Sequence, residues 1–425
     1  MGETPPASPP RSGSCLSDEF SKVALGTCSS PSWSDLPMDV LLLILQRLEL
    51  PQSLAFASVC KTWRAAAITA SVPRSCTPWI LSWAHLAQGE RPSPVTCNLY
   101  HLLDGDKAYG VSFPRGCFNA CCGASHGWLI LVNELSNLVL YNPFTTRIIP
   151  LPPITDFSCV EAVYRSGGSL EGYHLGTGGR VYGSDELGKI FYQKAVLSCS
   201  PSKGGDYIVM IIHRDSDWLS FVKAGQRNWQ VASSLGVSQK DKYADCAYHD
   251  GRFYTVTFDG LVEKWDIDGL NGPTREVVVA ARCHVGLILT RHLVPTPWGD
   301  LLQVRAIRSD GSPDGIRFQI RKVELNGCKR ISYKDLMGHA LLLGLNHSAC
   351  LHTKDFPGLQ AQCVYFSVPW MVETSHWIRR SCAWGGVRIY NFECKKFERA
   401  LPIRYSKSKR FIHVFPTEVW ITPNL

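Results

Sequence analysis

A recurring pattern of short apolar strands and turns fills the chain beyond residue 78, and it limits the possible folds more than any other feature. The clearest unit is "GWLILVNELSNLVLYNPFTTRIIPLPP" (127–153), which reads as three strands separated by turns. The strands are rich in Val, Ile, Leu and Tyr, and Asn, Gly and Pro stand between them, as in strands joined by hairpins. The pattern therefore predicts a series of small antiparallel sheets.

Five further segments repeat this plan, the first of them more weakly: residues 78–114, 206–233, 245–269, 300–327 and 362–401. Asp250-Gly251 and Asp259-Gly260 are dipeptides that favour hairpin turns. The repeat interval exceeds the roughly 40–50 residues of regular propeller repeats, so we expect inserted loops. Small sheets repeated around an axis leave few exposed edges, which suits an all-β region of about 350 residues. We predict a large all-β propeller of about six blades over residues 73–425; an irregular pair of β-sandwiches is the alternative.

The C-terminal stretch "EVWITPNL" (418–425) is apolar and reads as one more strand. Closing a ring of small sheets removes their exposed edges, and propellers often complete one blade from both ends of the chain. We therefore expect this strand to be buried and to pair with a strand that precedes Pro114.

The segment "SDLPMDVLLLILQRLELPQSLAFASVCKTWRAAA" (34–67) has a different, helical period. We expect one helix from about residue 38 to 48, a second from about 51 to 57, and a third after them. Apolar residues would share one helical face across the last junction: Phe56, Val59, Cys60, Trp63 and Ala67. The segment thus predicts a small all-α block of three helices ahead of the β region.

The first of these helices has more apolar residues than one buried face needs. A stripe at helical spacing is expected to be buried and consists of Val40, Leu41, Ile44, Leu45 and Leu48. Leu42 and Leu43 add apolar side chains on the opposite side, and a helix that is apolar all round is normally buried on every side. Three short helices of about 40 residues cannot build an adequate core alone. The block therefore needs a further surface to pack against.

The flanks of the helical block are polar or irregular. Ser34 or Asp35 can cap the first helix, with Pro37 near its first turn. "VPRSCTP" (72–78) ends the helical character. Residues 1–31 are rich in Pro and Ser and cannot bury enough apolar surface, so they are predicted to be disordered.

Composition argues against a membrane or nucleic-acid-binding protein. Hydrophobic residues make up 45% and charged residues 19% of the chain, as in an ordinary globular protein. The longest apolar block, Val40 to Leu45, is far shorter than the roughly 18 residues of a membrane span. The net charge of +8 is spread along the chain, so nucleic-acid binding is not indicated. The N-terminus has no secretory leader, and Pro6 replaces the Ser or Thr of a myristoylation signal, so we expect a cytoplasmic or nuclear location.

Local motifs indicate no catalytic or cofactor site. The sequence has no G-x-S-x-G, phosphate-loop or H-E-x-x-H pattern. Its 17 cysteines form no C-x-x-C pair and are expected to be reduced and buried. Two clusters could in principle hold zinc, namely Cys117, Cys121, Cys122 and His126, and the segment from His347 to His352. Their spacing matches no usual zinc framework, so we expect neither a metal nor a cofactor.

Two further short motifs have alternative interpretations. Trp265-Asp266 resembles the dipeptide of WD repeats but lacks the upstream Gly-His, so Trp265 is expected to pack within a blade. "RYSKSKR" (404–410) is either a nuclear-import or phosphate-binding patch or a solvated loop.

The helical segment resembles an F-box. The similarity rests on Leu36-Pro37, on Ile44-Leu45 with Leu48, on Leu54, and on the closing "SVCKTWR". The rest of the chain is similar to the kelch-like propeller of a large plant family, the KIB type, in which such a propeller accompanies an F-box. That similarity rests on residues 127–153, 248–268 and 416–425. Residues 155–190 and 370–385 fit poorly and are expected to be inserted or divergent loops. The resemblance divides the chain into an F-box domain at 32–72 and a propeller at 73–425.

The resemblance implies a substrate-recognition subunit of an SKP–cullin–F-box ubiquitin ligase. The F-box would bind the SKP adaptor, and through it the cullin–RING ligase, while the propeller would bind an unknown target protein. The residues implied in adaptor binding are Leu36, Pro37, Ile44, Leu45, Leu48, Leu54, Val59, Cys60 and Trp63. Other subunits would transfer ubiquitin, so this chain is not expected to be an enzyme.

Two alternatives remain open at this stage. The chain is alternatively a free-standing propeller binding protein or a propeller enzyme whose helical block packs on its own β domain. Exposure of the helical block distinguishes these cases, because a receptor should present an apolar helical surface that the propeller does not cover. An F-box protein that acts outside ubiquitination is a third possibility.

Overall fold

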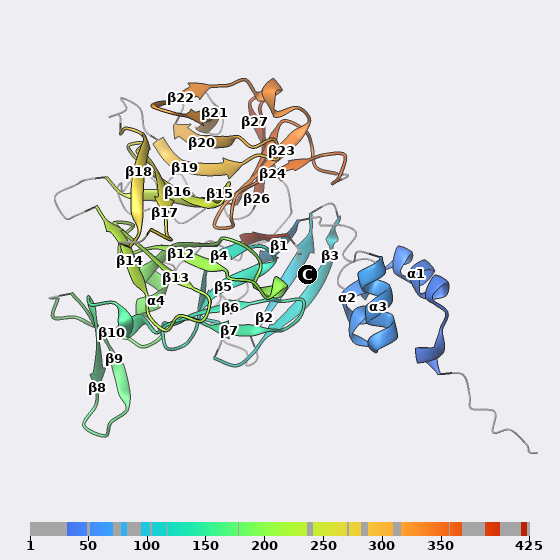
Figure 1. The fold of residues 1–425 in the computed structure, drawn as a ribbon, viewed down its shortest axis with the longest axis horizontal. Coiled ribbons are helices and arrows are strands. Elements are labelled where there is room, and N and C mark those ends of the chain that lie inside the picture. The colour runs from blue at the N-terminus through green and yellow to red at the C-terminus, as the bar shows by residue number, and fades with distance from the viewer. Residues whose placement is uncertain are drawn as a thin grey trace, which may run out of the picture.

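The computed structural model describes residues 32–48, 52–70, 78–82, 95–102, 104–116, 118–176, 178–235, 241–269, 272–281, 288–308, 316–356, 358–367, 387–399 and 418–422. The predictions for residues 1–31, 370–385 and 404–410 fall outside these ranges. The described part consists of a small helical block followed by a large β domain (Figure 1).

Six sheets of four or five strands make up most of the described β domain, and we number them blades 1 to 6. Blade 1 contains β1 (Trp79–Ser82), β2 (Val95–His101), β3 (Asp104–Phe113) and β28 (Glu418–Ile421), and blade 2 contains β4 (Ala120–Ser125), β5 (Trp128–Val132), β6 (Leu138–Tyr141) and β7 (Ile148–Pro150). Blade 3 contains β11 (Tyr192–Leu197), β12 (Ile208–His213), β13 (Trp218–Lys223) and β14 (Gln230–Ser234), and blade 4 contains β15 (Tyr243–His249), β16 (Arg252–Thr257), β17 (Val262–Asp266) and β18 (Thr274–Val279). Blade 5 contains β19 (Ile288–Pro295), β20 (Leu301–Arg308), β21 (Ile316–Glu324) and β22 (Gly327–Arg330), and blade 6 contains β23 (His339–Leu343), β24 (Ala349–His352), β25 (Cys363–Ser367), β26 (Val387–Asn391) and β27 (Lys396–Arg399). The predicted all-β propeller is thus confirmed, and its six blades agree with the expected number.

Blades 2 to 5 are simple antiparallel meanders, because consecutive strands pair in chain order. The hairpin predicted at Asp250-Gly251 joins β15 to β16, and both residues have positive φ, as a two-residue turn of this kind requires. Blade 6 departs from the pattern. Its order is β24-β23-β25-β26-β27, and β23 pairs in parallel with β25.

The two ends of the β domain meet in blade 1. β28 pairs antiparallel with β1, so that Trp79 is opposite Ile421 and Ser82 is opposite Glu418. Val419, Trp420 and Ile421 are buried. The expected pairing of the C-terminal strand with a strand before Pro114 is therefore confirmed.

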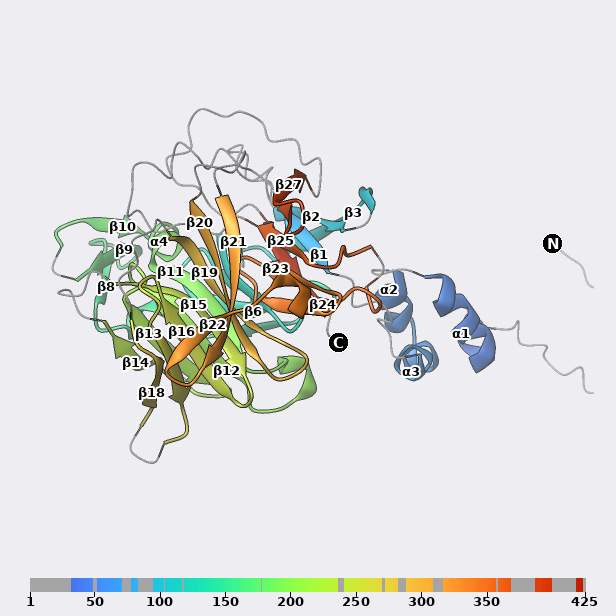
Figure 2. The same ribbon diagram turned by 90° about the horizontal axis from the view of Figure 1, so that it is seen from above.

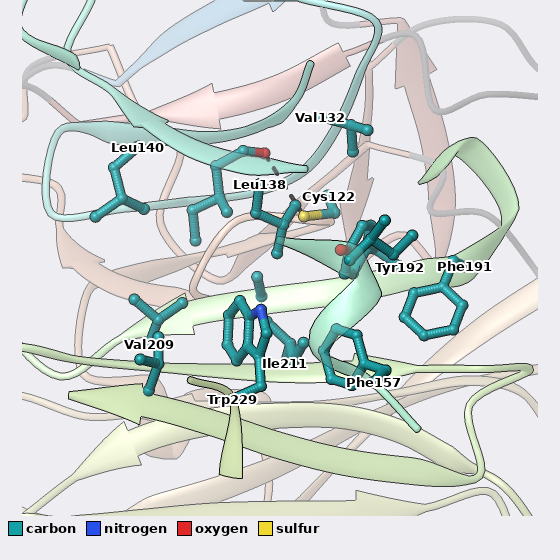
Figure 3. Packing of buried hydrophobic residues seen from close by; sticks show 14 of the residues in the cluster. Cys122, Val132, Leu138, Leu140, Phe157, Phe191, Tyr192, Val209, Ile211 and Trp229 are labelled. Carbon is teal, nitrogen blue, oxygen red and sulfur yellow. Dashed lines mark hydrogen bonds between the residues drawn. The ribbon is translucent and has the colours of Figure 1, made fainter. Parts of the chain in front are cut away.

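Apolar side chains fill the wedges between neighbouring blades. Figure 3 shows one such cluster, in which Leu138 and Leu140 of blade 2 face Val209, Ile211 and other residues around blade 3. Strands β4 and β11 approach each other so closely that one contact requires a glycine. A side-chain methyl group at Gly123 of β4 would collide with the carbonyl oxygen of Ala195 of β11. Many of the described aromatic residues, including Trp79, Trp128, Trp265 and Trp420, are buried in these cores.

Residues 155–190 were expected to be an inserted or divergent loop, but they contain regular secondary structure. They form a seventh, three-stranded sheet of β8 (Val160–Tyr164), β9 (Leu170–Leu175) and β10 (Val181–Gly183), followed by the short helix α4 (Leu187–Phe191). Gly167 and Gly168 lie in the turn between the paired strands β8 and β9. Phe157 and Tyr173 are buried in the adjoining core. This sheet extends away from the blades (Figure 1).

The helical block contains α1 (Met38–Arg47), α2 (Gln52–Ser58) and α3 (Lys61–Thr69). The three predicted helices are present with boundaries shifted by one residue or so. The expected caps of α1 were wrong, because Pro37 stands at its N-cap and Asp35 instead belongs to a capping box with Ser32 on a preceding 3-10 turn. The continuous face across the last junction was also wrong, since Val59 and Cys60 separate α2 from α3. None of the helices in the described residues is long and apolar enough to cross a membrane.

Candidate functional site

The helical block has a small core of its own. Its buried members are Leu41, Leu45, Phe56, Ala66, Ala67 and Ala70, and the described residues that pack around them all come from 36–63. No described side chain of the propeller belongs to this cluster. Both ribbon views show the three helices to one side of the blades (Figures 1 and 2). Among the described residues, the block therefore does not use the propeller as its missing packing surface.

The outer side of this block is unusually apolar. Leu43 of α1 is 59% exposed, Val59 is 56% exposed, and Ile68 of α3 is 71% exposed. Val40, which the sequence placed in the buried stripe, is also exposed at 38%. A helix of this length turns only part of its circumference toward two neighbouring helices, so the remaining apolar residues face outward. Each of α1, α3 and the junction between α2 and α3 thus leaves an apolar side chain outside the block core.

The residues predicted for adaptor binding occupy three different environments. Pro37 and Val59 are exposed, Leu45 is buried in the block core, and five others are half-buried: Leu36, Ile44, Leu48, Cys60 and Trp63. The structure gives no side-chain environment for Leu54, although its backbone lies in α2. Leu36, Ile44, Leu48 and Trp63 pack against the block core, whereas Pro37 and Val59 are exposed. Sequence reasoning did not include Leu43 and Ile68, whose exposure depends on how the helices pack.

Trp63 holds the block together at one end. Its ring packs on Phe56 with ring centroids 4.3 Å apart, and its Nε1 donates a hydrogen bond of 2.9 Å to the carbonyl oxygen of Trp33. Cys60 stands at the N-cap of α3, where the backbone amide of Trp63 lowers the pKa of its thiol. Trp63 is therefore a supporting residue whose removal would disturb the geometry of the whole surface.

Ionisable side chains in the propeller gather at the axis, where the inner strands meet. Lys194 of β11 forms a buried ion pair with Asp245 of β15, and its Nζ also donates to the carbonyl oxygen of Gly344 at 3.2 Å. Asp245 accepts 2.8 Å hydrogen bonds from the backbone amides of Cys246 and Leu293. Burial raises the pKa of Asp245, but Lys194 and His292 outweigh it and lower that pKa. Because its partners come from blades 3 to 6, we interpret this network as a structural link between blades.

The residues once considered for zinc do not form a metal site in the described part. No group of three or more His, Cys, Asp and Glu side chains there is placed to hold a metal ion. Burial raises the pKa of the Cys121 thiol to about 12, and the Sγ of Cys122 donates to the carbonyl oxygen of Ile130. Cys117 lies outside the described residues.

Two recesses on the propeller are large enough to take a ligand or part of a partner. One of about 320 Å³ lies near the axis beside His126, His347 and Trp420. The other, of about 740 Å³, lies between blades 5 and 6 and is lined by residues of β21, β22 and β26 together with the turn before β27. Neither could be read from the sequence, because each joins segments that are distant along the chain.

Two family models match this chain. The model described as the KIB1-4 beta-propeller matches residues 99–391, and the F-box domain model matches residues 33–71. The F-box match spans the three helices, and the propeller match spans β3 to β26 completely together with the end of β2.

Curated relatives come from Arabidopsis thaliana. The probable F-box protein At4g22165 is 25% identical over 351 residues, which cover 79% of this chain and 84% of that protein. The F-box protein At1g10110 is 23% identical over 379 residues, which cover 84% of this chain and 88% of that protein. The F-box/kelch-repeat protein At1g57790 is 30% identical over a shorter stretch of 135 residues, which covers 31% of this chain and 35% of that protein.

Proposed function

Because this chain belongs to the KIB1-4 beta-propeller family and has an F-box domain ahead of its propeller, we propose that it is the substrate-recognition subunit of an SKP–cullin–F-box ubiquitin ligase. In this role the helical block binds an SKP adaptor and the propeller binds the protein to be ubiquitinated. The chain itself performs no chemistry, since ubiquitin transfer belongs to other subunits. The function is thus that of a bridge between two protein partners.

The observation that carries the proposal is the uncovered apolar surface of the helical block. In a propeller enzyme or a free-standing binding protein, the block would cover its apolar residues with its own β domain. The described propeller contributes nothing to the block core, and Leu43, Val59 and Ile68 stay exposed. An adaptor that packs on this surface would supply the missing burial, which is favourable by about 25 cal/mol for each Å² of apolar surface removed from water.

We expect the double change Leu36→Ala with Pro37→Ala to weaken binding of a purified SKP adaptor by roughly thirtyfold or more. Burying a Leu side chain is worth about 1.5–3 kcal/mol, and truncating an interface anchor costs about 2 kcal/mol or more. A factor of ten corresponds to about 1.4 kcal/mol. Adaptor affinity is measured by calorimetry, with circular dichroism of each variant to confirm its fold.

Two additional variants make this test specific. Val59→Ala removes an exposed side chain, so it should weaken adaptor binding without disturbing the block core. Leu325→Ala removes a leucine that is 73% exposed on blade 5 and should leave adaptor binding unchanged. If the wild-type chain binds no SKP adaptor at all, the receptor role is wrong and the free-standing propeller becomes the better account.

A further inference from the structure

The groove between blades 5 and 6 combines an apolar floor with a positively charged rim. Its volume of about 740 Å³ lies within the range of about 300–1,000 Å³ that is usual for ligand sites. Phe318 and Ile320 of β21 form the floor on the blade 5 side, and Tyr390 and Phe392 form it on the blade 6 side. Figure 1 shows the strands involved, β21, β22 and β27, near one another at one side of the propeller.

The rim carries four basic side chains. Arg317 and Arg330 stand on the blade 5 side, and Lys395 and Lys396 stand on the blade 6 side; all four are exposed. Among the described residues that line the groove, none is Asp or Glu. Positive charge on both walls of an apolar groove is complementary to a partner with negative charge and at least one apolar side chain.

The floor is rigid and packed. Phe318 lies 5.2 Å from Tyr390 between ring centroids, Tyr390 lies 5.3 Å from Phe392, and Tyr333 stacks parallel to Phe392 at 6.2 Å. These rings belong to the core between blades 5 and 6, so the groove does not depend on a mobile loop for its floor. A preformed surface loses less entropy when it binds a partner.

The backbone of the groove walls also favours an extended peptide. β22 is the last strand in the order of blade 5, and β27 is the last strand in the order of blade 6. Among the described strands these two are therefore sheet edges, and peptides can add to a sheet edge as a further strand.

Lysine and arginine on edge strands also discourage unwanted sheet pairing, which gives Arg330 and Lys396 a simpler explanation. Protection of a sheet edge does not explain Arg317, however, because its strand β21 lies inside the sheet of blade 5. Adding a strand to a sheet edge requires a polypeptide backbone, so the two outermost strands favour a peptide over a nucleic acid.

We propose that this groove binds an extended acidic segment of the target protein, with carboxylates on the basic rim and an apolar side chain on the aromatic floor. The proposal rests on the receptor function proposed above, because it assigns the target to one place on the propeller. Glutamate and aspartate are the source of the negative charge in this proposal. Phosphoserine and nucleic acid are competing partners that the experiment distinguishes.

The test measures binding of short fluorescein-labelled peptides to the full-length chain by fluorescence anisotropy. The probe alternates glutamate with phenylalanine, and its control has lysine in place of glutamate. We expect the glutamate peptide to bind and the lysine peptide not to bind. Binding should weaken as ionic strength rises from about 0.1 M to about 1 M, because the Debye length falls from about 10 Å to about 3 Å.

The variant Arg330→Glu with Lys396→Glu reverses two charges on opposite walls of the groove, and we expect it to bind the glutamate peptide about tenfold more weakly or worse. Its matched control is Arg165→Glu with Arg227→Glu, which makes the same change in net charge at two exposed arginines away from the groove. The control should bind like the wild type.

Three results would overturn the proposal: no binding of the glutamate peptide by the wild type, equal loss in both double variants, or tighter binding of a phosphoserine peptide or a single-stranded oligonucleotide. Adaptor binding is measured on the same preparations. If the adaptor binds but the peptide does not, only the groove proposal fails. If the peptide binds at the groove but no adaptor binds, the ligase function fails and the acidic-peptide site remains.

Discussion

At the scale of single residues, histidines in the propeller core link stability to pH. Burial lowers the pKa of His213 and His347 to about 3, so both rings stay neutral in the folded protein at neutral pH. The Nε2 of His347 accepts a 3.1 Å hydrogen bond from the backbone amide of Tyr248, which leaves the proton of the neutral ring on Nδ1. An unfolded chain would protonate the same rings near pH 6.5.

We expect the free energy of unfolding to fall as the pH drops below about 6.5. At pH values between the folded pKa of about 3 and the unfolded pKa of about 6.5, the unfolded state binds more protons than the folded state. The stabilisation is therefore complete above about pH 6.5 and is lost as the pH falls below that value. Each histidine should contribute a loss of roughly 2 kcal/mol by about pH 5. Urea unfolding at several pH values measures this dependence.

His347→Gln should make the dependence on pH shallower, since glutamine can accept the same amide hydrogen bond without titrating. An unchanged slope in His347→Gln would show that other groups cause the acid sensitivity.

At the scale of secondary structure elements, β28 is the strand on which ring closure depends. Its buried residues Val419, Trp420 and Ile421 supply one edge of blade 1, and Trp420 packs on Tyr365 of blade 6 with ring centroids 6.1 Å apart. Without this strand, β1 would lose a partner along its whole length. The strand therefore holds blades 1 and 6 together as well as completing one sheet.

We expect deletion of residues 418–425 to cause aggregation or misfolding, because it exposes the edge of β1 and a large apolar surface. Deletion of 423–425 alone keeps β28 and should give a soluble, folded protein. Near-ultraviolet circular dichroism and the soluble fraction after expression are the measurements. A folded, monomeric protein that lacks all eight residues would contradict the importance of closure.

Local sequence patterns predicted most of these elements, because a helix or a hairpin is specified by residues that are close together in the chain. The strands β5 to β7, the Asp250-Gly251 hairpin and the three helices all follow from apolar spacing and turn residues. The sheet of β8 to β10 was missed because its short strands lie among glycines and polar residues. The parallel pairing of β23 with β25 was also missed, since β24 is inserted between them in the chain but not in the sheet.

The candidate sites were predicted only in part, for a similar reason. The helical block is continuous in sequence, so its site residues could be named, although the exposure of Val40 and Leu43 depends on helix packing. Lys194, Asp245 and His292 come from three different blades, and the basic groove joins β21 and β22 with residues about 60 positions further on. Contacts between distant segments leave no local pattern that a single sequence could reveal.

At the scale of the whole molecule, the helical block and the propeller have separate cores. We expect a chain without residues 34–67 to keep the thermal transition of the propeller within about 2 °C, since no described propeller side chain loses a packing partner in the block core. The same deletion should abolish adaptor binding and leave peptide binding at the groove intact. Differential scanning calorimetry provides the comparison. A drop of several degrees would show that the propeller depends on the helices.

The pairing of β28 with β1 also sets the order of events during protein synthesis. A ribosome that has made β1 must add all of residues 83–417 before the partner strand exists, which takes on the order of a minute at about 5–20 residues per second. The helical block, in contrast, is complete before the first strand emerges. A nascent chain thus presents its complete helical block while one edge of β1 is still without its partner strand β28.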